Sequence, residues 1–168
     1  GYKVCEPPDT KNMCGSKVDK EEDLCIICRI FGTAGDKFAR ASKVKFRDAF
    51  PLGEVEREEV RTGVALDRET GAVYKGMLYT VEAVPAGTRF GLEVVADNLT
   101  DEELRILNAA FKSVEDTCLG GQSSRGFGKV KIVVERVRRR TAGYYLGEEE
   151  EKVYEGDELR ALLEKGQR

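Results

Sequence analysis

The amino-acid sequence predicts a fold of the α+β class, in which one long helix packs on short strands. Residues 100–118 repeat apolar side chains at spacings of three and four, as an amphipathic helix does. Residues 42–50, 89–96 and 129–137 are alternating or β-branched stretches that are typical of strands. Because the helix lies between the last two stretches, we expect a β-α-β unit, in a chain of 168 residues that suits one domain.

The composition restricts the possible functions. The chain is 40% hydrophobic and 35% charged, which is typical of a globular protein with a highly charged surface. It has no histidine, which excludes the commonest general base, catalytic Ser/His and Cys/His pairs and any His-ligated metal. No apolar run has the length of a membrane helix and no signal peptide opens the chain, so we expect a cytoplasmic protein without a membrane partner.

Four of the five cysteines lie near the start of the chain, at Cys5, Cys14, Cys25 and Cys28. In a cytoplasmic protein such a cluster favours zinc over disulfides, and the Cys25-x-x-Cys28 spacing lets both thiolates reach one tetrahedral ion. A site of four thiolates has no open coordination position, so its role would be structural. A redox pair and two structural disulfides are the alternatives. We interpret residues 1–41 as a cysteine-rich, zinc-binding insertion.

Residues 42–50 predict a half-buried strand with a basic outer face. Val44 and Phe46 face one way, whereas the other face carries three cations, Lys43, Lys45 and Arg47. Three cations in a row are either an ordinary solvated face or part of a surface for a polyanion.

Residues 64–74 predict a β-hairpin whose turn uses a positive φ at Gly71. The surrounding segment, about 53–80, has too few large apolar side chains to bury itself. We therefore expect a projecting hairpin, which is either a contact for a partner or a surface loop with none.

The helix over residues 100–118 begins with a capping box, Thr100-x-x-Glu103, and we expect Gly120 to end it. Its predicted buried face consists of Leu104, Leu107, Phe111, Val114 and Cys118. Cys118 is thereby predicted to be a core residue and not a fifth metal ligand.

A glycine-rich loop, residues 119–130, follows the helix, with four glycines among residues 120–128. It combines main-chain N–H groups, two serine hydroxyls and two cations, Arg125 and Lys129, which suits a phosphodiester backbone. Residues 119–140 hold seven basic residues and one acid, so the rest of the chain must carry −9 if the whole carries −3. This asymmetry favours a localised anionic partner, although a solvated charge-rich surface is an equal alternative.

Five motifs in order resemble the RAMP proteins of type III CRISPR effector complexes, specifically their repeated backbone subunit. The resemblance spans about residues 25–134 and is carried by Cys25-x-x-Cys28-Arg29-Ile30-Phe31-Gly32, Val44-x-Phe46-x-Asp48-Ala49, Asp67-Arg68-x-Thr70-Gly71-Ala72, Val84-Pro85-Ala86-Gly87-Thr88-x-Phe90 and Leu119-Gly120-Gly121-x-x-Ser124-Arg125-Gly126-Phe127-Gly128-Lys129-Val130.

The resemblance implies a ferredoxin-like fold related to the RNA-recognition motif, with its core over residues 42–137 and a C-terminal extension over 138–168. It implies that the chain binds CRISPR RNA and complementary target RNA beside other RAMP subunits, which can include copies of itself in a filament. The hairpin would be the thumb that wedges into the guide–target duplex. The expected RNA-binding residues are Gly121, Ser123, Ser124, Arg125, Gly126, Phe127 and Lys129 of the loop, with Lys43 and Arg47 beside them.

One departure from the family concerns catalysis. Family members begin with a strand, a loop carrying the aspartate that cleaves target RNA, and a helix, and nothing before Cys25 matches these. We expect this first β-α unit to be missing from the chain or supplied by another polypeptide. No catalytic residue is therefore assigned, and Asp36, Asp48 and Asp67 do not fill the role. The alternatives are a RAMP endoribonuclease that cuts target or precursor RNA and a zinc-stabilised domain without a nucleic-acid role.

Overall fold

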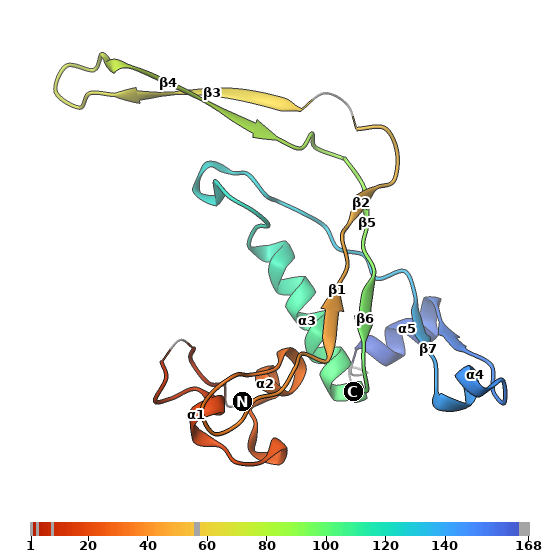
Figure 1. The fold of residues 1–168 in the computed structure, drawn as a ribbon. Coiled ribbons are helices and arrows are strands. Elements are labelled where there is room, and N and C mark those ends of the chain that lie inside the picture. The colour runs from red at the N-terminus through yellow and green to blue at the C-terminus, as the bar shows by residue number, and fades with distance from the viewer. Residues whose placement is uncertain (1, 3, 8, 56–57, 165–168) are drawn as a thin grey trace. The chain divides into compact units, whose positions relative to one another are not determined.

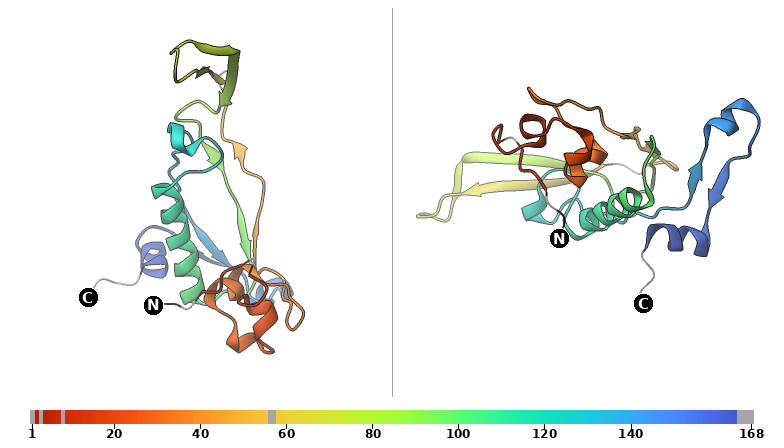
Figure 2. Two further views of the ribbon diagram at one scale, coloured as in Figure 1. Left: turned by 90° about the vertical axis from the view of Figure 1, so that its left-hand side faces the viewer. Right: turned by 90° about the horizontal axis from the view of Figure 1, so that it is seen from below.

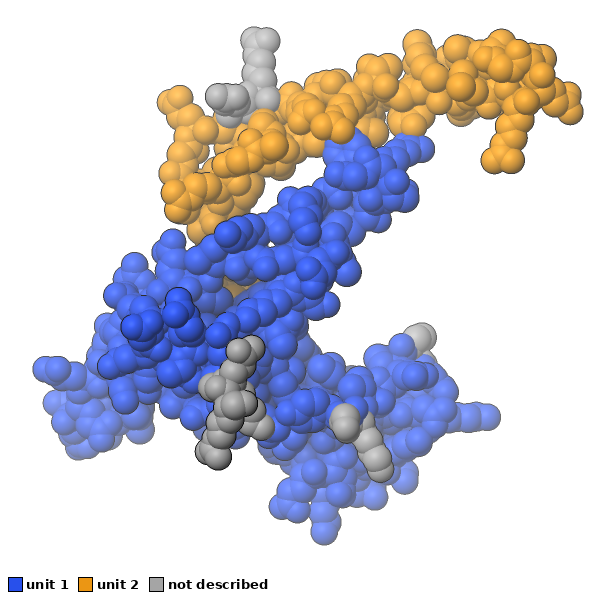
Figure 3. Space-filling view, turned by 180° about the vertical axis from the view of Figure 1, so that it is seen from behind, with its two compact units in different colours: residues 1–45, 96–168 blue, residues 46–95 orange. Residues whose placement is uncertain are grey.

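The computed structural model describes residues 2, 4–7, 9–55 and 58–164. It confirms a mixed fold of helices and antiparallel strand pairs (Figure 1). The chain divides into two compact units, one of residues 1–45 and 96–168 and the other of residues 46–95 (Figure 3). The two units are distinguished by their contacts and not by their function, so the domain boundaries that we predicted at residues 41 and 137 stay a prediction.

The first part of the larger unit has little regular structure, but it has a core. Its helices are short: α1 (Cys14–Lys17), the 3₁₀ turn η1 (Glu21–Asp23) and α2 (Ile26–Phe31). Between them Cys14, Leu24 and Cys28 are buried against one another, and Phe38 packs on this cluster. Ile30, on α2, is fully buried.

The long helix is α3 (Asp101–Asp116), and its predicted capping box is confirmed. The Glu103 N–H donates to the Thr100 hydroxyl at 3.2 Å, and the Thr100 N–H donates to the Glu103 carboxylate at 3.0 Å. The predicted end at Gly120 is wrong. Thr117 ends the helix because its N–H and hydroxyl both donate to the carbonyls of Ser113 and Val114.

The apolar face of α3 is only partly covered. Leu107 is buried, whereas Leu104, Phe111, Val114 and Cys118 are half-buried. Part of the cover comes from α5 (Gly156–Leu163), which packs against α3 and contains two buried leucines, Leu159 and Leu163 (Figure 2).

The strands form four two-stranded ladders within the described residues. The pairs are β1 (Val44–Phe46) with β6 (Val94–Ala96), β2 (Phe50–Pro51) with β5 (Phe90–Gly91), β3 (Glu59–Leu66) with β4 (Val73–Ala83), and β7 (Val137–Arg139) with β8 (Lys152–Tyr154). A short helix, α4 (Ala142–Leu146), connects β7 to β8.

The predicted hairpin is confirmed and extends beyond residues 64–74, since β3 and β4 pair from Glu59 to Ala83. At its turn the Asp67 carboxylate accepts the N–H groups of Glu69 and Thr70, both at 2.9 Å. Gly71 has the expected positive φ, +67°. The directly opposed side chains of Val64 and Leu78 are 44% and 67% exposed, so the hairpin leaves apolar surface uncovered. That the hairpin projects from the domain stays a prediction.

The predicted strand over residues 129–137 is wrong for all but its last residue, where β7 begins. The alternation of side chains is present: Val130, Ile132 and Val134 are half-buried, whereas Lys131 and Val133 are exposed. However, residues 129–136 pair with no strand in the part of the chain that the structure describes. The predicted β-α-β unit is therefore incomplete.

None of the described helices is long and apolar enough to span a lipid bilayer.

Candidate functional site

The glycine-rich loop is closed at its base by backbone contacts. The Leu119 N–H donates to the Gly128 carbonyl at 2.8 Å, which brings together the two ends of residues 119–128. A Cβ atom at Gly128 would lie 2.4 Å from the Leu119 carbonyl oxygen, and Gly128 has a φ of +82°. Both observations require glycine at this position.

Inside this closure the loop presents unpaired backbone donors. The chain turns through positive φ at Gly120 and Gln122 and enters the 3₁₀ turn η2 (Ser123–Arg125), which ends at Gly126. Among the hydrogen bonds of the described residues, none is donated by the backbone N–H groups of residues 120–124. Successive free N–H groups in such a turn form a concavity that suits an anion, and phosphate oxygens are ligands of this kind.

Most of the loop residues expected at RNA are exposed. Ser123, Ser124 and Arg125 are exposed, as are Gly121 and Gly126. Phe127 is half-buried. The loop thus offers hydroxyl, guanidinium and amide donors on one short exposed segment.

Lys129 is exposed, but its ammonium is bound within the chain. Its ammonium donates to the backbone carbonyl of Glu115, in the last turn of α3, at 2.5 Å. The carboxylate of the same Glu115 accepts the N–H of Ile132 at 2.6 Å. Reasoning from the sequence missed Glu115, and no pattern in the sequence connects it with residues 14 and 17 positions further on.

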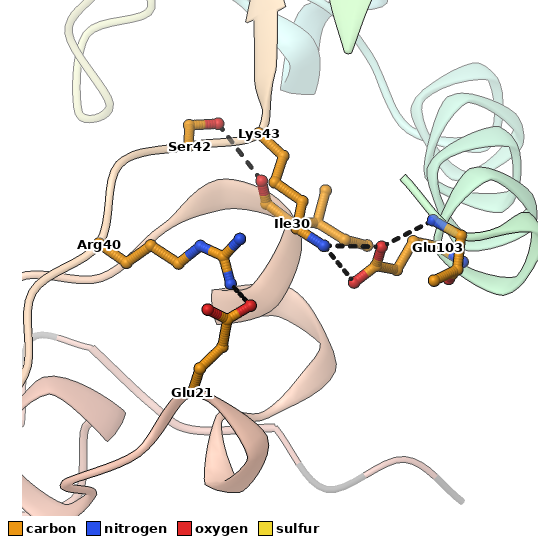
Figure 4. A network of polar contacts seen from close by, with 7 residues as sticks. Glu21, Ile30, Arg40, Ser42, Lys43 and Glu103 are labelled. Carbon is orange, nitrogen blue, oxygen red and sulfur yellow. Dashed lines mark hydrogen bonds and ion pairs between the residues drawn. The ribbon is translucent and has the colours of Figure 1, made fainter. Parts of the chain in front are cut away.

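Lys43 does not lie on an exposed basic face, so that part of the strand prediction is wrong. Its ammonium is 3.0 Å from both carboxylate oxygens of Glu103, and the two side chains are 11% and 3% exposed (Figure 4). Lys43 precedes β1, and its N–H donates to the carbonyl of the buried Ile30. The alternating pattern therefore does not apply to it. Its expected role at RNA stays a prediction, which the pairing of its charge disfavours.

Glu103 is negatively charged in this pair. Burial alone would raise its pKa, but the Thr100 N–H and the Lys43 ammonium favour the carboxylate and hold the pKa below its ordinary value. Figure 4 also shows Arg40 paired with Glu21 in the cysteine-rich part of the same unit.

Much of the basic segment that follows the loop is neutralised. Arg136, Arg139 and Arg140 form ion pairs with Glu155, Asp101 and Glu151. Arg139 also lies over the Tyr154 ring, with 5.6 Å from guanidinium carbon to ring centroid. In the smaller unit, Arg47 is exposed and lies 3.4 Å from the Glu93 carboxylate. The excess positive charge of residues 119–140 is therefore less concentrated than the sequence suggests.

The four predicted metal ligands come together. The sulfur atoms of Cys5, Cys14, Cys25 and Cys28 all lie within 4.8 Å of one another. The Cys5 sulfur is 3.3 Å from that of Cys28 and 3.7 Å from that of Cys25, and all four thiols are free of disulfides. Sulfur atoms around a tetrahedral zinc ion are about 3.8 Å apart, given Zn–S bonds of about 2.3 Å. The donor set therefore fits one metal ion, and Cys118 lies outside it.

The thiols differ in acidity. Burial opposes ionisation of Cys25, but the N–H of Cys28 and the other thiols of the cluster outweigh it and lower the pKa of Cys25 to about 7. Burial raises the pKa of Cys28, and the neighbouring thiols add to this rise. Cys14 also has a raised pKa, mainly because of burial.

Comparison with known families gives a match to the RAMP superfamily over residues 1–131. A protein of Methanothermobacter thermautotrophicus named "CRISPR system Cms endoribonuclease Csm3" is 31% identical over 147 residues, covering 74% of this chain and 60% of the relative. A protein of the same name from Methanocaldococcus jannaschii is 32% identical over 149 residues, covering 83% of this chain and 60% of the relative. The chain thus spans about 60% of the length of these relatives.

Among solved structures, a chain titled "Type IV-B CRISPR Complex" is 18% identical with a TM-score of 0.47, covering 68% of this chain and 54% of that chain.

Proposed function

The chain belongs to the RAMP superfamily, and on this basis we propose that it is an RNA-binding subunit of a type III RNA-guided interference complex. In this proposal its glycine-rich loop holds the backbone of a CRISPR RNA. The relatives named Csm3 place its homologues in a CRISPR system. The observation that carries the proposal is the loop itself, in which the backbone N–H groups of residues 120–124 have no acceptor among the described residues and lie beside exposed Ser123, Ser124 and Arg125.

The ligand class follows from the donors. Main-chain N–H groups, hydroxyls and a guanidinium recognise phosphate oxygens without reading the base, as a subunit that holds guides of different sequence requires. We propose Gly121, Ser123, Ser124, Arg125 and Gly126 as the contacts, with Phe127 beside them. The complementary target RNA, other RAMP subunits and further copies of the chain are the proposed partners.

Further features complete the proposal. The helix α3 and the two-stranded ladders suit a ferredoxin-like core, and the hairpin β3–β4 suits the thumb of this family, since its apolar side chains are exposed. The cysteine cluster would hold a structural zinc ion, and the cytoplasm would be the site of action.

A second function, endoribonuclease activity, is favoured by one observation, the name that both relatives carry. In this reading the chain contributes RNA binding to an enzyme that cuts target RNA. Incubation of labelled complementary RNA with the guide-loaded complex, with and without a divalent ion, tests it. Cleavage at regular positions would support the enzyme, whereas intact RNA under both conditions would leave only the binding role.

The binding role is tested with the Arg125→Ala variant and single-stranded RNA of guide length. A hydrogen bond to a charged group contributes about 1.5–3 kcal/mol, so we expect the affinity to fall by at least about tenfold. The slope of the logarithm of the binding constant against the logarithm of the salt concentration should also become less steep by about 0.7, because one phosphate contact is lost. The control is Arg160→Ala, which removes an exposed arginine from α5. Equal affinities and salt slopes for wild type and Arg125→Ala would contradict the proposal.

A further inference from the structure

Besides the backbone bond between Leu119 and Gly128, one residue makes two further contacts at the base of the glycine-rich loop. Glu115 lies in the last turn of α3 and is half-buried. Its carboxylate accepts the Ile132 N–H at 2.6 Å, and its backbone carbonyl accepts the Lys129 ammonium at 2.5 Å. Both contacts tie the chain that leaves the loop to the helix that leads into it.

The two contacts are chemically suited to this place. A lysine ammonium is favoured at the carboxyl end of a helix, where it binds the last free carbonyls and interacts favourably with the helix dipole. A carboxylate that accepts a backbone N–H makes a charge-assisted hydrogen bond, which is stronger than a neutral one. Residues 129–136 have no neighbouring strand among the described residues, so the Ile132 bond to Glu115 is a main attachment of this segment.

A carboxylate is electrostatically unfavourable beside a site for RNA phosphates, because its charge repels them. Its position at the base of the loop calls for a benefit that offsets this repulsion. The contacts hold the loop in one conformation. RNA binding then loses less conformational entropy, because the donors are already ordered.

We infer that Glu115 is a positioning residue: with Lys129 it forms a latch that orders the loop of residues 119–128 for an RNA backbone. The inference rests on the proposed function and deepens it. It also assigns Lys129 to the latch and not to a phosphate contact.

The sign of a mutational effect separates the latch from simple electrostatics. If Glu115 acted only through its charge, its removal would strengthen RNA binding. The latch predicts the opposite, because the loop loses the anchor that the Glu115 carboxylate provides. Asp116 is the matched control: it is the next residue of the same helix, carries the same charge and is exposed, and its carboxylate makes no hydrogen bond or ion pair among the described residues.

The experiment compares Glu115→Ala, Glu115→Gln and Asp116→Ala, each of which removes one negative charge. The first measurement is hydrogen exchange in the free protein. The N–H groups of Leu119, Gly126 and Ile132 are hydrogen-bonded in the wild type. We expect them to exchange about tenfold faster in Glu115→Ala, since about 1.4 kcal/mol of local stabilisation corresponds to tenfold. They should change little in Glu115→Gln, which keeps an oxygen acceptor, and in Asp116→Ala.

The second measurement is the affinity for single-stranded RNA of guide length. We expect a fall of about tenfold for Glu115→Ala, recovery of most of this loss in Glu115→Gln, and an equal or higher affinity for Asp116→Ala. Unchanged exchange in Glu115→Ala would overturn the latch itself. Faster exchange with unchanged or stronger RNA binding would overturn the link to RNA. An absence of RNA binding by the wild type would contradict the proposed function, and the exchange data would then decide on the latch alone.

Discussion

Two regions differ in a way that would not be expected from their regular structure. The cysteine-rich segment, residues 5–40, is irregular but has a buried core, whereas the hairpin β3–β4 is regular but exposed. The cysteine-rich segment contains only short helices, yet it buries Cys14, Leu24, Cys28 and Ile30. The hairpin is paired along most of its length, yet Val64 and Leu78 remain exposed. Local hydrogen bonds are sufficient for a ladder, whereas burial requires something that covers the apolar side chains. We propose that a metal ion organises the first region and that a partner covers the second.

The largest expected effect comes from the metal. A structural zinc ion contributes about 10–16 kcal/mol of apparent binding free energy, so its removal should unfold the cysteine-rich segment. We expect one zinc ion per chain by metal analysis, and after chelation rapid hydrogen exchange in α2 with little change in β3–β4. Cys28→Ser should lose the metal, and the control Cys118→Ser should keep it. Full metal content in Cys28→Ser would count against the site.

The next effect compares two lysines that are almost neighbours. Lys43 and Lys45 each lie 3.0 Å from a carboxylate, but the Lys43 pair is buried and the Lys45–Asp97 pair is about two-thirds exposed. Removing one partner of a buried pair costs about 3–5 kcal/mol, because the other charge is left unpaired. An exposed pair contributes about 0–1 kcal/mol. Urea unfolding should therefore show a much larger loss for Lys43→Met than for Lys45→Met, and equal losses would contradict the difference in burial.

The buried pair also predicts a pH dependence. The pKa of Glu103 is lower in the folded protein than its ordinary value of about 4.3. Its contribution to the free energy of unfolding is therefore fully present above about pH 4.3 and is lost as the pH falls through the folded pKa. We expect the stability difference between wild type and Glu103→Gln to shrink below about pH 4 in urea unfolding. A difference that stays constant down to pH 3 would mean that the charge of Glu103 does not stabilise the fold.

The smallest effects are expected in the hairpin. Gly71→Ala places a Cβ at a φ of +67°, which costs about 1–2 kcal/mol of local stability and should speed amide exchange in β3 and β4. Val64→Thr removes apolar surface that is already exposed, so the free energy of unfolding should change by less than about 0.5 kcal/mol. A loss above 2 kcal/mol for Val64→Thr would show that this face is covered within the isolated chain.

The sequence predicted correctly those features that depend on contacts between residues close together in the chain. The capping box at Thr100, the turn at Gly71 and the Cys25-x-x-Cys28 pair are set by neighbours within a few residues, and the structure confirms them. The alternation at residues 129–136 correctly indicates which side chains face inward. It does not reveal whether a second strand is present, and that determines whether a ladder forms.

The remaining errors at the site have the same origin. The pairing of Lys43 with Glu103 joins residues 60 positions apart, and Glu115 meets Ile132 across 17. Charge alone gave no sign of either contact, because the acids are remote in the sequence. Several cations that appear available in the sequence are for this reason paired in the structure.

The most direct test of RNA binding by the loop is the hydrogen exchange of its own amides. The N–H groups of residues 120–124 donate no hydrogen bond among the described residues, so they should exchange rapidly in the free protein. On addition of saturating single-stranded RNA of guide length, we expect exchange at these amides to slow by tenfold or more, together with that of Arg125 and Gly126. RNA binding with unchanged exchange at residues 120–126, and protection elsewhere, would contradict the assignment of the loop as the RNA site.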